Sequence, residues 1–199
     1  MSSPNLTHYQ RNLPHWLPAG ETLFITFRLA GSLPAAVLDK LRAELENMPK
    51  TADPAERYAR QKRYFGRFDE QLDAAQAGPV WLKQPAIVGL VAQALHQADK
   101  QTYTLQCYCI MANHVHLVVS LDDNAPSLTR TLQGIKSYTA YNANKLLQRT
   151  GQFWQRESYD HIVRDAAELE RVIAYVLENP VKAGLVDDWQ KWPYTYWAQ

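Results

Sequence analysis

Hydrophobic residues recur along this chain in two patterns, short strand-like runs and helix-like stripes spaced three or four residues apart. Residues 22–29, rich in Phe, Ile, Leu and Thr, predict a strand. Residues 103–111 and 114–121 predict two more strands, joined by a tight turn. Residues 159–163 predict a fourth, short strand.

Stretches with a helical period separate these strands. Each has an apolar stripe and a recognisable start signal, and they cover residues 34–45, 85–100, 127–146 and the segment after Asp165. Ser127 is expected to cap the third helix. Asp165, followed three residues later by Glu168, resembles a capping box at the start of the last helix.

The order of these elements predicts an α+β fold, with helices on one face of an antiparallel sheet. The charged, Ala-rich residues 48–80 are broken by prolines and a glycine, and they predict a helical insertion. A chain of 199 residues is long enough for one real core. We therefore expect a single domain over residues 1–199.

Composition narrows the class of protein. The net charge of +1, with 46% hydrophobic and 21% charged residues, is ordinary for a globular protein. Apolar runs stay below the roughly 18 residues that a membrane span needs, and no signal peptide is expected. Cys107 and Cys109 lie too close along one strand to staple a fold. We expect a cytoplasmic protein.

The segment Asn113-His114-Val115-His116 holds the most informative residues of the chain. Side chains two apart in a strand point to the same face, so His114 and His116 converge where Val or Leu would be usual. Two neutral imidazoles side by side form a natural half of a divalent metal site.

The last helix is predicted to supply the rest of the site. Its apolar stripe leaves Tyr175 off centre, and Asn179 lies four residues further on the same side. Pro180 is expected to stop the helix. A phenol and an amide oxygen on one polar flank could both face a site, although a tyrosine with a wet hydroxyl at the rim of a core is common.

These groups suit attack on a phosphodiester. A divalent metal held by His114, His116 and the side-chain oxygen of Asn179 could polarise a phosphate. Tyr175 could then attack in line and form a phosphotyrosine bond to DNA. Because that bond keeps the energy of the phosphodiester, the step predicts strand transfer rather than simple hydrolysis.

These motifs resemble those of a known family. His114-Val115-His116 resembles the HUH motif, and the segment from Ala174 to Leu185 resembles the nucleophile helix of single-tyrosine HUH (IS200-like) transposases. The similarity is greatest to the REP-associated tyrosine transposases. The segments 109–113, 151–156, 159–162 and 192–194 also fit, so the resemblance covers about Thr22 to Tyr196.

The resemblance implies a ferredoxin-like fold and an endonuclease dependent on Mg²⁺ or Mn²⁺. It implies a substrate of single-stranded DNA with a palindromic hairpin, a 5′-phosphotyrosine on Tyr175 and a free 3′-OH. Insertion-sequence relatives usually carry Gln at the position of Asn179, and Ala112 replaces a common Pro. The resemblance allows a monomer or a homodimer.

Basic residues predict where DNA would bind. Arg63 and Arg67 belong to a basic run interleaved with aromatics, which can track phosphates and stack on bases. Lys136 and Arg130 on a second helix are further candidates. A solvated helix face explains the same residues equally well. Tyr138 and Tyr141, rival nucleophiles by position, are interpreted as packing or DNA-stacking residues.

Two other functions remain open from the sequence. One is a non-catalytic DNA-hairpin binder or repressor derived from a transposase. The other is a zinc-stabilised interaction module, in which Cys107 and Cys109 lie opposite His116 and His114. A shift of one residue in the strand register would send the cysteines to the other face.

Overall fold

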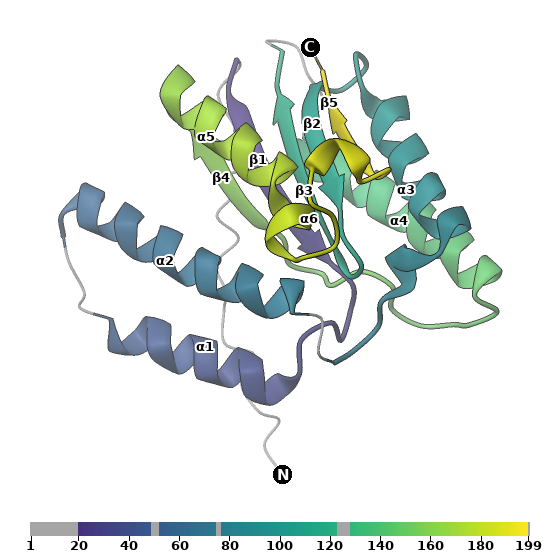
Figure 1. Cartoon of the computed structure of the whole chain (residues 1–199), viewed down its shortest axis with the longest axis horizontal. Helices are drawn as coiled ribbons and strands as arrows, with labels where there is room; N and C mark the ends of the chain where they lie inside the picture. Colours follow the sequence, from purple (N-terminus) through teal and green to yellow (C-terminus); the bar gives the residue numbers. More distant parts are fainter. Residues whose placement is uncertain (1–19, 49–51, 75–76, 123–127, 199) are drawn as a thin grey trace.

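The centre of the molecule is a five-stranded antiparallel sheet with the order β4-β1-β3-β2-β5 (Figure 1). The structure is a computed structural model that describes residues 20–48, 52–74, 77–122 and 128–198. The four predicted strands are confirmed, and a short C-terminal strand joins them. Their bounds are β1 Thr22–Arg28, β2 Thr104–Ile110, β3 His114–Ser120, β4 Tyr159–Val163 and β5 Thr195–Trp197.

Helices fill the connections between the strands. They are α1 Ala35–Asn47, α2 Pro54–Asp73, α3 Pro85–Ala98, α4 Leu128–Leu146, α5 Ala166–Leu177 and α6 Asn179–Lys182, with short 3₁₀ turns η1 Trp81–Lys83 and η2 Trp189–Lys191. The predicted cap Ser127 lies outside the described residues. Within the part of the chain that is described, no helix combines the length and apolarity needed to cross a membrane.

The predicted start of α5 is confirmed, because Asp165 caps the helix. Asp165 Oδ1 accepts a hydrogen bond from the Glu168 backbone N–H at 2.7 Å. In a capping box the Glu168 side chain would bond back to the N–H of Asp165. Here it accepts from the neighbouring N–H of Arg164 at 2.8 Å instead.

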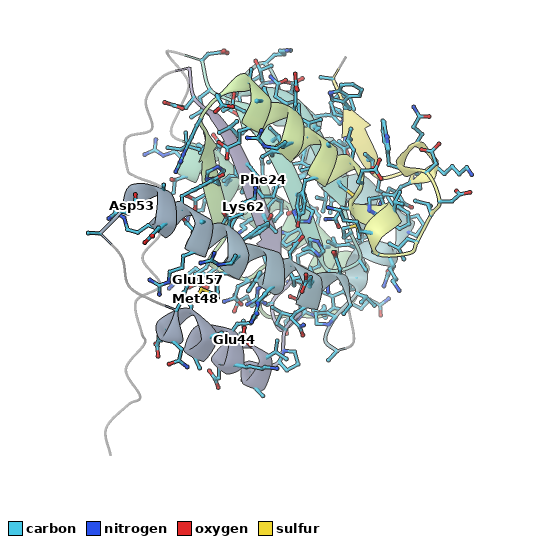
Figure 2. All side chains as sticks on the ribbon, turned by 60° about the vertical axis from the view of Figure 1, so that its left-hand side comes forward. Phe24, Glu44, Met48, Asp53, Lys62 and Glu157 are labelled. Atoms are coloured by element: carbon cyan, nitrogen blue, oxygen red, sulfur yellow. The ribbon has the colours of Figure 1, made fainter. Side chains whose placement is uncertain are left out.

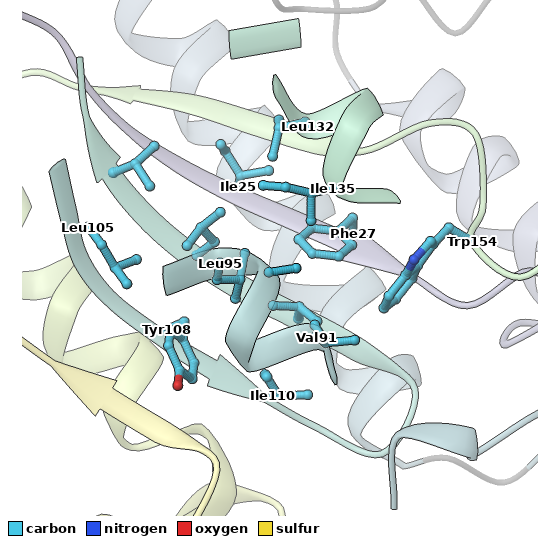
Figure 3. Packing of buried hydrophobic residues seen from close by; sticks show 14 of the residues in the cluster. Ile25, Phe27, Val91, Leu95, Leu105, Tyr108, Ile110, Leu132, Ile135 and Trp154 are labelled. Carbon is cyan, nitrogen blue, oxygen red and sulfur yellow. The ribbon is translucent and has the colours of Figure 1, made fainter. Parts of the chain in front are cut away.

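The first four strands have the ferredoxin-like arrangement, and the crossover helices α3 and α4 lie on one face of the sheet as predicted (Figure 1). Figure 3 shows the core between them, where side chains of both helices meet those of the strands. Its labelled members include Ile25, Phe27, Val91, Leu95, Leu132 and Ile135. The expected α+β fold is thus confirmed.

Helices also cover the opposite face, which corrects the prediction that they would lie on one face only. β1 and β3 are buried at all but one terminal residue each, so both faces of the sheet need a cover. α5 packs on β2 and β3 there, and α2 contributes Phe65 to the same layer. This second cluster contains Phe24, Phe65, Cys107, Cys109, Met111, Val118, Val176 and Leu177.

A β-bulge decides which side chains of β2 face the second cluster. The register between β2 and β3 shifts between Leu105 and Cys107. Leu105 faces α3 and α4, whereas Cys107 faces α5, although the two residues are separated by two positions. The bulge therefore places Cys107 and Cys109 on the same face as His116.

The segment from Gly31 to Gly78, which contains α1 and α2 and is called the excursion below, leaves the sheet layer and returns to it at one point. Gly31, just after β1, and Gly78, just before η1, lie in contact, and both have positive φ. A Cβ built on Gly78 would lie 2.2 Å from the Gly31 carbonyl oxygen. Only glycine fits this closure, because a side chain would meet backbone rather than a movable group.

α2 is fastened to the sheet along its length. Near its start, the Tyr58 hydroxyl donates to Glu168 Oε1 on α5, and His161 Nε2 lies 3.1 Å from the same oxygen. Further along, the Phe65 ring stacks on Tyr159 of β4 with a centroid separation of 4.0 Å. These contacts hold α2 across the face of the sheet that carries the histidines.

We predict that Gly78→Ala lowers the free energy of unfolding by about 2–4 kcal/mol, because it combines a left-handed backbone with a backbone clash. Gly89→Ala on α3 is the matched control. A Cβ there meets nothing within 4 Å, so helix propensity should raise stability by up to about 1 kcal/mol. Urea unfolding curves measure both values, and equal effects would contradict the closure.

We predict that Glu168→Gln lowers the free energy of unfolding by about 1–3 kcal/mol at neutral pH, because Tyr58 and the Arg164 N–H then donate to a neutral group. Burial opposes ionisation of Glu168, but these hydrogen bonds and His161 outweigh it, so its pKa lies below the ordinary 4.5. The stabilisation is therefore complete above about pH 4.5 and is lost as pH falls through the lower folded pKa.

The exposed Glu170 of the same helix provides the control, since Glu170→Gln should leave the unfolding curve nearly unchanged. Denaturant unfolding between pH 3 and 8 would show the difference. If the Glu168→Gln deficit persisted undiminished at the acid end, the ionised carboxylate would not be the stabilising group.

Candidate metal and nucleophile site

The two histidines of β3 meet inside the protein, on the face covered by α2 and α5. His114 pairs with Arg28 and His116 with Thr26 of β1, so both imidazoles point away from the α3 and α4 core. Both residues are fully buried. Their Nε2 atoms are 3.0 Å apart, which confirms the convergence expected from the spacing of two residues.

Hydrogen bonds on the far side of each ring orient the histidines. Asn113 Nδ2 donates to the Leu72 carbonyl at 3.0 Å, so its Oδ1 faces His114 and accepts from Nδ1 at 2.7 Å. His114 therefore carries its proton on Nδ1, which leaves a bare lone pair on Nε2. Thr26 Oγ1 hydrogen-bonds with His116 Nδ1 at 2.8 Å and so fixes the orientation of that ring. This is the outer hydrogen bonding typical of metal-binding histidines.

Two carboxylates from α2 approach the same point. Asp69 Oδ1 lies 3.4 Å from His116 Nε2 and 3.9 Å from His114 Nε2, and Asp73 Oδ1 lies 3.6 Å from His114 Nε2. The two residues are one helical turn apart, so both face the sheet. Asp69 is as well shielded as the histidines, with an exposed fraction of 2%.

Burial determines the charges of these groups. It lowers the pKa of both imidazoles to about 3, so they are neutral at physiological pH. It also raises the pKa of Asp69, against the opposing effect of His114. Burial and the nearby charge of Asp69 raise the pKa of Asp73 to about 7. The enclosed space therefore holds carboxyl groups whose charge is poorly compensated by the protein alone.

The site has more acceptors than donors. Asp69 Oδ1, Asp73 Oδ1 and Asn179 Oδ1 are buried and accept no hydrogen bond from the residues that the structure describes. Orphaned buried acceptors are costly in proteins, and a cation that binds lone pairs removes the cost. In the described part of the chain, Asp69, His114 and His116 form the only group of three or more His, Cys, Asp or Glu residues whose ligand atoms lie within 4.8 Å of one another. Nitrogen and carboxylate donors of this kind fit a divalent metal.

Tyr175 of α5 lies at the edge of this group. Its hydroxyl donates a hydrogen bond to Asp69 Oδ2, and its ring centroid lies 5.7 Å from that of His116. Burial and the charge of Asp69 raise the pKa of Tyr175 well above its ordinary 10.0, so the phenol is protonated. The Lys182 ammonium lies 4.1 Å above the same ring. The predicted nucleophile is thus held one hydrogen bond away from a candidate metal ligand.

Asn179 lies on a different helix from the one that the sequence predicted. α5 ends at Leu177, and Asn179 begins the short helix α6, whereas the sequence predicted one continuous helix to Pro180. The side chain is nevertheless fully buried and lies on the side of Tyr175. Asn179 Nδ2 is 3.5 Å from Asp69 Oδ2, which leaves its amide oxygen available as a ligand.

The predicted DNA contacts lie elsewhere. Lys136 of α4 donates to the Gln155 carbonyl at 3.0 Å and to Ser158 Oγ at 2.7 Å, so it fastens the segment before β4. Arg130 is exposed on the same helix. Arg63 and Arg67 are exposed on α2, and Arg67 pairs with Glu44 of α1 at 2.5 Å. These four residues remain predictions as DNA contacts.

The rival tyrosines are separated from the histidines by the sheet. Tyr138 and Tyr141 lie on α4, which covers the opposite face, and they are 47% and 62% exposed. They are therefore not core-packing residues, and neither reaches the histidine pair.

The zinc arrangement does not form in the described part of the chain. Cys109 lies opposite His116 and Cys107 opposite Val118, so the cysteines share the face of the histidines without flanking both of them. The Cys109 thiol contacts Met111 Sδ and Thr195 Oγ1, each at 3.6 Å. Burial raises the pKa of both thiols, which keeps them protonated within the second cluster.

Sequence reasoning missed Asp69 and Asp73, because the span that contains them was interpreted as an insertion. A signal was present. Phe65, Asp69 and Leu72 share one side of a helix at spacings of four and three residues, and all three are buried. An aspartate within an apolar stripe indicates a buried carboxylate with a partner to find.

Comparison with known proteins agrees with this geometry. A sequence model of the family described as "Transposase IS200 like" matches residues 88–179, from α3 through Asn179. A curated protein of Haemophilus influenzae, named as a REP-associated tyrosine transposase, is 29% identical over 96 residues. That match spans 44% of this chain and 54% of the relative, so the chain spans about half of its length.

The fold is similar to that of a solved protein. The structure entitled "Structure of the REP associates tyrosine transposase bound to a REP hairpin" aligns with a TM-score of 0.55. The alignment covers 96% of this chain and 82% of that chain at 14% identity, which shows likeness of fold alone. The matches of sequence and fold together confirm the resemblance of this chain to the IS200-like family and to the REP-associated tyrosine transposases within it.

Proposed function

We propose that this protein nicks and rejoins single-stranded DNA at palindromic, REP-like hairpins, through a covalent 5′-phosphotyrosine on Tyr175. One observation carries the proposal. A tyrosine hydroxyl, two imidazole lone pairs and a carboxylate come from α5, β3 and α2 to a single buried point. The stability of the fold does not require these polar groups to meet, because apolar side chains would fill the same space with less strain.

The relatives support the class of substrate. The similar solved structure is that of a transposase bound to a REP hairpin, and the curated relative carries the name of the same group. The family match spans both the histidine pair and Tyr175. We infer that hairpin DNA is the substrate of this chain as well.

His114, His116 and Asp69 would hold a divalent metal ion, Mg²⁺ or Mn²⁺, and the buried amide oxygen of Asn179 would be a further ligand. When bound, such an ion supplies Lewis-acid polarisation of the phosphate and neutralises its developing charge. Asn113 would keep the proton of His114 on Nδ1, and Thr26 orients the ring of His116 through its Nδ1.

Tyr175 provides the nucleophile and Asp69 receives its proton. The phenol is neutral at rest, so attack requires an acceptor for the proton, and Asp69 Oδ2 already accepts its hydrogen bond. A bond forms between the phenolic oxygen and phosphorus as the bond from phosphorus to the 3′-oxygen breaks. The leaving 3′-oxygen takes up a proton and becomes a free 3′-OH. Lys182, above the ring, adds positive charge near the phosphate.

The same residues allow the reverse step. The phosphotyrosine bond conserves the energy of the broken linkage, so a 3′-OH can attack it and regenerate the phenol. Water would hydrolyse the intermediate if it entered freely. The burial of His114, His116 and Asp69 keeps the space around the linkage dry.

We predict that Tyr175→Phe abolishes a covalent protein–DNA adduct that the wild type forms with Mg²⁺ or Mn²⁺ and loses in EDTA. The hydroxyl is the attacking group, whereas the ring contacts with Phe24 and His116 survive in phenylalanine. Denaturing gels with labelled hairpins formed by the palindromes that flank the gene measure the adduct. Tyr138→Phe, on the opposite face, should retain it.

If Tyr175→Phe kept the adduct and Tyr138→Phe lost it, the assignment of Tyr175 as the nucleophile would be wrong. A native-gel shift on the same hairpins, with no adduct under any metal condition, would instead support the non-catalytic hairpin binder. Mutation of the tyrosine should leave that native-gel shift nearly unchanged in either case.

We predict that Asp69→Asn weakens Mn²⁺ binding at least about tenfold, since it removes a charged ligand while keeping its shape. Titration of free Mn²⁺ by electron paramagnetic resonance measures this without DNA. Asp39→Asn, at a residue whose side chain is 71% exposed on α1, is the control. An unchanged affinity in Asp69→Asn would leave Asn179 as the third ligand.

A further inference from the structure

A second cavity lies beside the histidine site, between the excursion and the sheet. It measures about 240 Å³ and lies between α1 and α2 on one side and β1 and the segment before β4 on the other. Figure 2 shows Glu157, which lines this cavity, in the region between α1 and α2. Because drug-sized ligands occupy roughly 300–1,000 Å³, this space suits a smaller group.

Aromatic rings form much of the wall. Tyr64, Phe65 and Phe68 of α2 and Tyr159 of β4 all line the cavity. Tyr64 and Phe68 lie side by side, with ring centroids 6.3 Å apart and planes at 34°. Flat rings of this kind are the surfaces on which unstacked nucleobases bind, since every base has a π-face.

A buried cation also lines the cavity. Arg28 is 7% exposed, and its Nη1 donates to Ser32 Oγ at 3.1 Å and to the Leu29 carbonyl at 3.4 Å. Among the residues that the structure describes, Arg28 forms no ion pair. A guanidinium has five donors, so further donors are available to an acceptor in the cavity. Burial lowers the pKa of Arg28, and the nearby charge of Glu157 offsets this only in part, so the buried charge is costly and favours a ligand that accepts from it.

A carboxylate also lines the cavity and narrows the class of ligand. Glu157 lines the cavity, and its Oε2 accepts from Gln155 Nε2 at 2.7 Å. Arg28 and Arg42 supply donors to the cavity, and Glu157 supplies an acceptor. The edge of a nucleobase offers acceptors to a guanidinium and N–H donors to a carboxylate, whereas a phosphate offers acceptors only.

The cavity is one side chain away from the candidate nucleophile. Phe65 lines it and lies 6.2 Å, between ring centroids, from Tyr175. Thr26 lines it as well, and its hydroxyl holds His116. A DNA strand bound at Tyr175 would therefore lie close to the cavity.

We propose that this cavity, the base pocket, binds one unstacked nucleobase next to the phosphate that Tyr175 attacks. The inference rests on the proposed function and deepens it, because it assigns to α2 a role in selecting the cleavage position. The rings of Tyr64 and Phe68 stack on the base, while Arg28 and Glu157 contact its edge. The identity of that base is then part of the recognition of the substrate.

The test measures affinity for uncleaved hairpin oligonucleotides in EDTA, with a single abasic site moved through each unpaired position. One position should be sensitive, and its abasic form should bind roughly tenfold more weakly to the wild type, as expected for one lost stacking contact. Tyr64→Leu should weaken binding of the intact oligonucleotide similarly. In this variant the abasic site should have no further effect, because base and ring act as a pair.

Trp197→Leu is the matched control, since it removes an exposed aromatic ring of β5 that lies outside the cavity. This variant should keep the full abasic effect. The inference is overturned if no position is sensitive, or if Tyr64→Leu keeps the wild-type abasic effect. Glu157→Gln should change which base is preferred at the sensitive position, and an unchanged preference would exclude the contact between Glu157 and the base.

Binding in EDTA separates this inference from the proposed chemistry. Loss of the abasic effect with a normal covalent adduct would overturn the base pocket alone. A sensitive position with no adduct under any metal condition would overturn the nicking activity and leave the pocket as part of a hairpin-binding site.

Discussion

The Nε2 atoms of His114 and His116 meet in a buried space, and most of the structure around them follows from this constraint. The two nitrogens lie 3.0 Å apart, so the rings must be held in place from their far sides. Asn113 and Thr26 supply that hold. The flanking strands carry apolar side chains on both faces, so that α5 and α2 cover the pair and keep water out.

The buried polar groups of this site lower the stability of the fold, and apolar burial in the two hydrophobic clusters offsets that loss. Buried carboxyl groups at Asp69 and Asp73 and an unbonded amide oxygen at Asn179 all oppose folding. The core between the sheet and α3 and α4 contains none of these groups and provides the main apolar burial. The fold thus separates the face that stabilises the protein from the face that carries its candidate chemistry.

The sequence was sufficient for β1 to β4, for the positions of α3 to α5, and for the convergence of His114 with His116, because each depends on local spacing. A separation of two residues in a strand or four in a helix fixes which side chains share a face. It was not sufficient for Asp69, which reaches the histidines across 45 residues of chain. The sequence analysis also did not predict that α2 and α5 cover the second face of the sheet, and the reason is related. Periodicity shows that a strand is buried but not which helix buries it.

The contact between Gly31 and Gly78 has a consequence for how this protein can vary. Because the chain departs and returns at one place, the intervening segment can lengthen, shorten or change without altering the strand order. The histidines and Tyr175 belong to the sheet and to α5, whereas the carboxylates and most aromatic walls belong to the excursion. The aromatic walls on α2 can therefore vary with the excursion, whereas the contact of Asp69 with the histidines limits how far that segment can change.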